Sequence, residues 1–121
     1  MLSSPAIAAG TVYVGSGDGK LYAFLAGCGT GGAVCSPTWV APMSAPVNSS
    51  PAVANGVVYA GSNDGRLYAF AVGCGTGGAV CSPLWTGATG AAILSSPAVS
   101  NGVVYVGSHD ARLYAFSPAS P

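Results

Sequence analysis

Short apolar runs alternate with clusters of glycine, asparagine, serine and aspartate along most of the chain. Residues 51–70 show the pattern clearly: PAVA is followed by NG, then VVYAGS, NDG and RLYAF. Runs rich in β-branched and aromatic residues, bounded by turn formers, predict β-strands. Asn55-Gly56 is a strong signal for a two-residue hairpin turn. No segment has the 3.6-residue apolar period of a helix, so we expect a structure that is nearly all strand.

The strand pattern is repeated along the chain. Three near-copies of a 22-residue string begin at Ser3, Ser49 and Ser95, 46 residues apart, and the second and third copies differ at four positions. Each of the segments 25–48 and 71–94 carries a tryptophan, and Leu84-Trp85-Thr86 is predicted to be a short fourth strand. Four antiparallel strands in a repeat of roughly 40–50 residues are typical of one blade of a β-propeller.

The predicted fold is therefore all-β, a partial β-propeller of four-stranded antiparallel blades. Residues 1–121 form a single repeat region with a first blade at 3–48, a second at 49–94 and a three-stranded third at 95–121. A parallel β-helix is the main alternative, but its rungs are generally shorter and its turns are not Asn-Gly hairpins. Because both faces of each blade pack against neighbouring blades, a propeller also explains a chain that is 50% hydrophobic and only 5% charged.

The charged residues are few and confined to one position of the repeat. The formal net charge is zero, and nucleic-acid binding is not expected because it requires a basic surface. Membrane insertion is not expected either, since no apolar run approaches the roughly 18 residues of a spanning helix. The charges lie in three equivalent turns, as Asp18 and Lys20, Asp64 and Arg66, and Asp110 and Arg112.

These turns have two interpretations. The tips form a charged ring that faces a ligand, or each aspartate closes its own turn while the nearby cation keeps the tip soluble. We favour the structural role for Asp18, Asp64 and Asp110. His109 lies in the third turn without a partner for metal binding or acid-base chemistry. Ala111 replaces a glycine there, and we expect strain if its φ is positive.

The string GCGTGGAVCSP occurs at 27–37 and again at 73–83. A zinc site is disfavoured because the two cysteine pairs belong to different blades. A phosphate cradle lacks a following helix and lysine, and a redox dithiol lacks the C-x-x-C spacing. We predict two disulfides that clasp the loop between the third and fourth strands, each contributing about 2.5 kcal/mol in the chain-entropy model. The pairs are Cys28–Cys35 and Cys74–Cys81, and they imply an oxidising compartment such as the bacterial periplasm, the cell surface or the medium.

Eight aromatic residues recur in register with the blades. They are Tyr13, Tyr59, Tyr105, Tyr22, Tyr68, Tyr114, Trp39 and Trp85. A stacking platform for a ligand is one interpretation. We favour packing between blades, with the rings filling the wedge between sheets and the polar tips bonding to the backbone.

The string SSPAVxNGVVYVGSxDxRLYAF, followed by a tryptophan-bearing strand, resembles the PQQ-like β-propeller repeat. This repeat occurs in quinoprotein alcohol dehydrogenases and in the outer-membrane β-barrel assembly lipoprotein, whose rings have seven or eight blades. The resemblance to the quinoproteins implies a calcium site of Glu, Asn and Asp, a catalytic Asp and often adjacent cysteines. This chain contains no Glu and no adjacent cysteines. No catalytic, cofactor-binding or metal-binding residue is therefore predicted.

The predicted function is a non-enzymatic propeller segment, acting as a scaffold or protein-interaction surface outside the cytoplasm and belonging to a larger propeller. Its expected partners are neighbouring blades, identical chains or an unknown protein. One alternative is a fragment of a PQQ-dependent dehydrogenase, with PQQ and calcium bound by blades outside this sequence. Another is a homo-oligomeric ring that assembles from copies of the chain.

Overall fold

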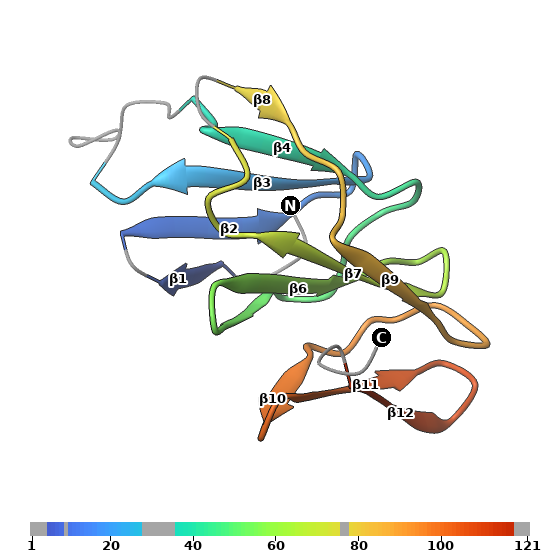
Figure 1. The fold of residues 1–121 in the computed structure, drawn as a ribbon. Coiled ribbons are helices and arrows are strands. Elements are labelled where there is room, and N and C mark those ends of the chain that lie inside the picture. Colours follow the sequence, from blue (N-terminus) through green and yellow to red (C-terminus); the bar gives the residue numbers. More distant parts are fainter. Residues whose placement is uncertain (1–4, 9, 28–35, 76–77, 118–121) are drawn as a thin grey trace.

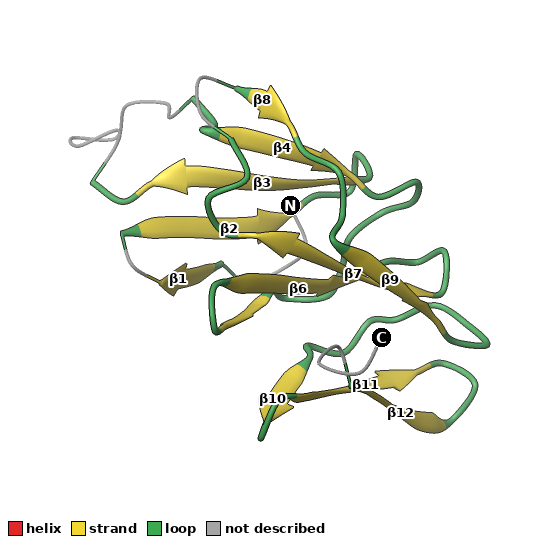
Figure 2. Cartoon of the chain, viewed as in Figure 1, coloured by secondary structure: helices red, strands yellow, loops and turns green. Residues whose placement is uncertain are grey.

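The computed structural model describes residues 5–8, 10–27, 36–75 and 78–117, and these residues form three β-sheets joined by turns. Figures 1 and 2 show the three sheets following one another in sequence order. The described residues contain no helix, and so none that is long and apolar enough to cross a membrane. The predicted all-β fold is confirmed.

Each sheet corresponds to one predicted blade. The first contains β1 (Ala6–Ala8), β2 (Thr11–Gly15), β3 (Lys20–Leu25) and β4 (Trp39–Pro42). The second contains β5 (Ala52–Ala54), β6 (Val57–Gly61), β7 (Arg66–Ala71) and β9 (Trp85–Ala88). The third contains β10 (Ala98–Ser100), β11 (Val103–Ser108) and β12 (Arg112–Phe116). Neighbouring strands are antiparallel within these sets, so each sheet is a simple up-and-down meander.

The hairpin turns follow the chemistry of their residues. Asn55 and Gly56 have φ of 52° and 76°, and Asn101 and Gly102 have the same two values. Two consecutive positive φ angles match the right-handed twist of the strands, and asparagine followed by glycine tolerates them best. The pairing register is the same in every copy, with Ala6, Ala52 and Ala98 opposite the equivalent tyrosines of the second strand.

One strand was not predicted. Within the cysteine-bracketed loop of the second repeat, β8 (Ala79–Val80) crosses to the first sheet and pairs in parallel with β4. Ala79 lies opposite Trp39 and Val80 lies opposite Val40. Two further amides strengthen the connection, since Gly78 N donates to the Thr38 carbonyl at 3.0 Å and Cys81 N donates to the Val40 carbonyl at 2.8 Å. The first sheet therefore has five strands, and its outermost strand comes from the next repeat (Figure 1).

The hydrophobic core lies between the sheets, because side chains on opposite faces of each sheet pack against different neighbours. We call one face the leucine face; in the first blade it carries Tyr13, Leu21 and Ala23. The other is the phenylalanine face, which in the second blade carries Val58, Tyr68 and Phe70. One buried cluster joins the leucine face of the first blade to the phenylalanine face of the second.

The second buried cluster repeats this junction one blade further along. It joins Tyr59, Leu67 and Ala69 of the second blade to Val104 and Val106 of the third. Both internal junctions thus use equivalent faces and run in the same direction. Stacking of this kind leaves few positions for charge, which accounts for the composition of the chain.

Glycine is required where the segment between blades crosses the sheet. A Cβ atom at Gly61 would overlap the side chain of Ile93, and one at Gly15 would overlap Val47 in the equivalent place. Val47 and Ile93 are fully buried and belong to the chain that leads from one blade to the next. The glycines before the first two charged turns therefore allow this connecting chain to lie directly against the sheet.

Candidate functional site: the turn rim

The charged turns lie along one side of the stack, where the second strand of each blade turns into the third. We call the turns at 16–19, 62–65 and 108–111 the turn rim; they join β2 to β3, β6 to β7 and β11 to β12 (Figure 1). Every charged side chain of the protein lies in these turns or at the first residue of the strand that follows. The rim therefore lies along one side of the stack, at the ends of the strands. It is the surface on which a polar ligand or a charged partner would meet charged side chains.

Each rim aspartate is held within its own turn. One carboxylate oxygen, Oδ1, accepts the backbone N–H two residues later, at 3.1 Å for Asp18, 2.9 Å for Asp64 and 3.1 Å for Asp110. The other oxygen, Oδ2, accepts the hydroxyl of the tyrosine four residues later. These tyrosines are Tyr22, Tyr68 at 2.5 Å and Tyr114 at 2.5 Å. This geometry agrees with a structural role for the aspartates and adds a tyrosine bond that the sequence analysis missed.

The tyrosine bonds shift the protonation equilibria in opposite directions. The Tyr22 hydroxyl lowers the pKa of Asp18, and Tyr114 does the same to Asp110. The hydrogen bond to Asp18 in turn raises the pKa of Tyr22. For Tyr68, burial raises the pKa first and the bond to Asp64 adds to it. Around neutral pH these carboxylates are therefore ionised and these phenols are neutral, so neither group is poised for proton transfer.

The rim also ties consecutive blades together. The Ser62 hydroxyl donates to the Met43 carbonyl at 3.1 Å, and the Ser108 hydroxyl donates to the Ala91 carbonyl at 3.0 Å. These carbonyls belong to the segment that connects the preceding blade. Ser62 is fully buried, so its hydroxyl satisfies backbone groups that water does not reach. The recurring Gly-Ser pair before each turn was the signal for this contact, although the sequence analysis assigned it no role.

Backbone amides of the rim make the same kind of contact. Asn63 N donates to the Pro46 carbonyl at 3.0 Å, and His109 N donates to the Ala92 carbonyl at 3.0 Å. His109 thus contributes its backbone to the junction while its side chain is exposed at the tip. Ala111 has a φ of 67°, so the positive φ considered for this position is present.

The recurrent tryptophans pack between blades. Trp39 lies between Tyr13 of its own blade and Phe70 of the next, with ring centroids 5.8 and 6.0 Å away. Its indole N–H donates to the Val72 carbonyl of the next blade at 3.2 Å. Trp85 repeats the arrangement, with its ring centroid 5.9 Å from that of Tyr59 and 6.1 Å from that of Phe116 in the next blade.

The tyrosines divide into groups that the sequence analysis did not separate. Tyr68 and Tyr114 lie on phenylalanine faces within internal junctions. Tyr22 and Tyr105 instead lie on the two outer faces of the stack, where no neighbouring blade of the described chain covers them. The expected backbone partners of the hydroxyl groups are also corrected, since the hydroxyls on the phenylalanine faces donate to aspartate. Tyr114 additionally accepts the Gly90 amide at 3.1 Å.

The second cysteine pair forms a disulfide between Cys74 and Cys81, seven residues apart. It closes the loop that carries β8, and Cys81 is only 4% exposed because it packs in the first inter-blade core. The other predicted pair, Cys28 and Cys35, lies outside the described residues. Over the described ranges, no three His, Cys, Asp or Glu side chains are placed to hold a metal ion.

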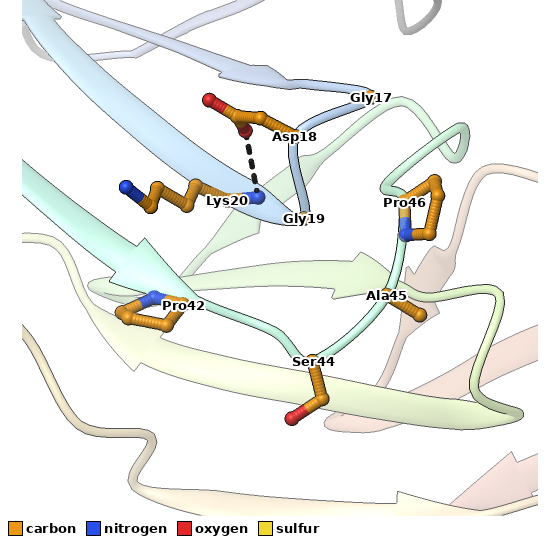
Figure 3. Close-up of a pocket in the computed structure, with 8 residues that line it drawn as sticks. All are labelled: Gly17, Asp18, Gly19, Lys20, Pro42, Ser44, Ala45 and Pro46. Atoms are coloured by element: carbon orange, nitrogen blue, oxygen red, sulfur yellow. Dashed lines mark hydrogen bonds between the residues drawn. The ribbon is translucent and has the colours of Figure 1, made fainter.

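A shallow pocket of about 360 Å³ opens on the rim of the first blade (Figure 3). Its walls are the turn from Gly17 to Lys20 and the chain that follows β4, from Pro42 to Pro46. Asp18 and Lys20 extend to the same side of the turn, and the Ser44 side chain points away from the turn. The charged side chains of Asp18 and Lys20 thus lie beside a lining that includes Pro42, Ala45 and Pro46.

Comparison with known proteins places this geometry among the propellers. A sequence profile described as outer membrane protein assembly factor BamB matches residues 1–77. Comparison with curated protein sequences finds no match. The structure of BamB from Moraxella catarrhalis superposes with a TM-score of 0.73 at 14% identity, over 95% of this chain and 32% of that one.

Two other solved structures have the same arrangement of strands. The computationally designed Ika4 protein gives a TM-score of 0.74 at 13% identity, over 93% of this chain and 63% of that one. The WD40 β-propeller domain of Doa1 gives 0.70 at 16% identity, over 93% of this chain and 36% of that one. The chain thus spans less than two thirds of each of these structures, and the similarity establishes a partial β-propeller fold.

Proposed function

Because the chain belongs to the family of the outer membrane protein assembly factor BamB, we propose that it is a non-enzymatic propeller segment that binds another protein outside the cytoplasm. In this role the stacked blades are the rigid scaffold and the turn rim is the contact surface. The family description, an assembly factor, supports a protein as the partner. The Cys74–Cys81 disulfide supports an oxidising compartment, in which such bonds persist.

The observation that carries the proposal is that both oxygens of each rim carboxylate accept a hydrogen bond from the same turn or from the strand that follows it. Each of Asp18, Asp64 and Asp110 uses one oxygen for a backbone amide and the other for a tyrosine hydroxyl. Bonds of this kind fix each carboxylate within its own turn. Three turns held in this way support a preorganised binding surface.

The proposal is tested by photocrosslinking in the native cells. A photoreactive amino acid is placed at the exposed rim positions Gly17 and His109, and at Asn55 and Asn101 as controls in the hairpin turns outside the rim. We expect the rim positions to give a discrete crosslinked protein and the controls to give none. Equal crosslinking from both sets, or none from the rim, would contradict the choice of surface.

Two further measurements test the absence of enzyme chemistry and the compartment. Addition of PQQ and calcium to the purified chain should leave the absorption of PQQ unchanged and yield no alcohol oxidation. A changed spectrum with turnover would instead support a dehydrogenase segment. Rapid alkylation of intact cells followed by mass spectrometry should find Cys74 and Cys81 unmodified, and alkylation of both would contradict an oxidising location.

A further inference from the structure

The two ends of the stack expose faces that are buried everywhere else in the protein. On the leucine face, Leu21 and Leu67 of the first and second blades are fully buried, whereas Leu113 of the third is 73% exposed. Ala115 is exposed as well, although the equivalent alanines are buried. The face that receives the next blade at both internal junctions is therefore open on the third blade.

The opposite face is open at the other end. Ile7 of the first blade lies on the phenylalanine face, opposite Val12, and is 71% exposed. The equivalent Val53 and Val99 pack against the buried clusters of the two internal junctions. Phe24 is half-buried, whereas Phe70 at the same position of the second blade is fully buried.

We propose that these two faces bind each other in different copies of the chain, so that the third blade of one copy receives the first blade of the next. The interface would continue a contact that already occurs twice within the chain, with leucine face on phenylalanine face in the same direction. Of the residues that would meet, Leu113 and Tyr105 are the counterparts of Leu67 and Tyr59. Asp18 and Lys20 lie at the rim edge of the phenylalanine face of the first blade. The equivalent Asp64 and Arg66 lie at the same edge of an internal junction and stay exposed, so the contact need not strip water from a charge.

Association of this kind is head to tail. The two surfaces that meet are different, so each added copy presents a fresh leucine face to the next. The contact between copies would be smaller than the internal ones, because among the described residues no strand with a tryptophan follows β12. We therefore expect association that depends on concentration rather than a permanent oligomer.

The test blocks one face at a time with a charge. Leu113→Asp closes the leucine face and Ile7→Asp closes the phenylalanine face, and the high exposure of both side chains leaves the fold intact. Leu84→Asp is the matched control, since Leu84 is 57% exposed but lies in the chain before β9, on neither open face. Circular dichroism verifies that each variant is folded.

Sedimentation of each protein, and of an equimolar mixture, then decides. We expect the mass of the wild type and of Leu84→Asp to rise with concentration, while Leu113→Asp and Ile7→Asp each stay monomeric. Mixing those two should double the mass and stop there, because only one intact pair of faces remains. A monomeric wild type, a mixture that stays monomeric, or loss of association in Leu84→Asp would overturn the proposal.

Discussion

At the scale of single residues, each charged turn depends on a few atoms placed to within hydrogen-bonding distance. In the turn at 62–65, Asp64 closes the turn and the Ser62 hydroxyl bonds to the chain that leads from the preceding blade. Gly61 makes room for Ile93, in the chain that leads to the next blade. The residue after the aspartate must adopt a positive φ, which is 87° at Gly19 and 86° at Gly65. The third turn departs from this rule by placing alanine there.

Replacing Ala111 with glycine should stabilise the protein. The φ of 67° costs a residue with a Cβ roughly 1–2 kcal/mol, and the greater freedom of glycine in the unfolded chain offsets part of the gain. We expect a net increase of about 0.5–1 kcal/mol in the free energy of unfolding, measured in urea. Gly19→Ala is the matched control and should shift the free energy in the opposite direction. An unchanged or lower stability of Ala111→Gly would show that this turn is not strained.

Removing the Tyr22 hydroxyl should raise the pKa of Asp18. The ordinary value of 3.8 is lowered in the fold, first by the bond from Tyr22, so the ionised carboxylate stabilises the folded state above about pH 4. That contribution is lost as the pH falls through the lowered pKa. In Tyr22→Phe, carboxyl NMR should show Asp18 titrating closer to 3.8, with Asp110 unchanged as the internal control. A titration of Asp18 equal to that of the wild type would mean that the tyrosine bond has no influence.

At the scale of elements, the loop containing β8 belongs to two blades at once. Its ends are covalently joined by Cys74 and Cys81 in the second repeat, while Ala79 and Val80 extend the first sheet. The pairing covers the outer edge of β4, an edge that would otherwise offer free amides and carbonyls to another strand. The disulfide thus holds a short strand that two residue pairs alone would not keep in place.

Loss of this disulfide should release β8. With both cysteines replaced by serine, we expect the free energy of unfolding to fall by about 2.5 kcal/mol in the chain-entropy model. In this variant, hydrogen exchange should become fast at the amide of Gly78 and at the amide of residue 81, which both donate to the first sheet. The amide of Leu84, which donates to Ala69 within its own blade, should stay protected. Retained protection at Gly78 would show that β8 pairs without the clasp.

The strands and turns of the blades could be predicted from local sequence, whereas β8 could not. Asn55-Gly56 and the β-formers of residues 57–61 specify their own hairpin, because the interacting groups are close in the chain. Ala79 and Val80 lie among glycines and pair with residues 40 positions earlier, in register with a sheet that exists only after the blades have stacked. The tyrosine bonds were accessible from sequence, since an aspartate recurs four residues before a tyrosine in every copy.

At the scale of the whole molecule, stability depends on junctions between neighbours. Among the described residues, each core cluster contains residues from two consecutive blades and none is shared by all three. In such an array the total free energy of unfolding is close to a sum of blade terms and junction terms. A change at one junction should therefore act mainly on the two blades that it joins.

Replacing Gly61 with alanine tests the second junction. The added Cβ would overlap Ile93, and overpacking of this kind costs about 1–3 kcal/mol. Gly17→Ala is the control, because nothing lies within 4 Å of a Cβ at that position. In a double-mutant cycle, the loss from Gly61→Ala should be smaller when Ile93 is already alanine. Additive losses would show that the added Cβ does not overlap the part of the Ile93 side chain that alanine lacks.

The crossing of β8 means that the repeat of the gene and the unit of the architecture have different boundaries. One sheet is completed by residues translated about 40 positions after its own fourth strand. Excision of residues 49–94 would therefore remove a whole blade and also an edge strand from the blade before it. A shortened version of this gene keeps the first sheet intact only when the first repeat stays together with the loop of the second.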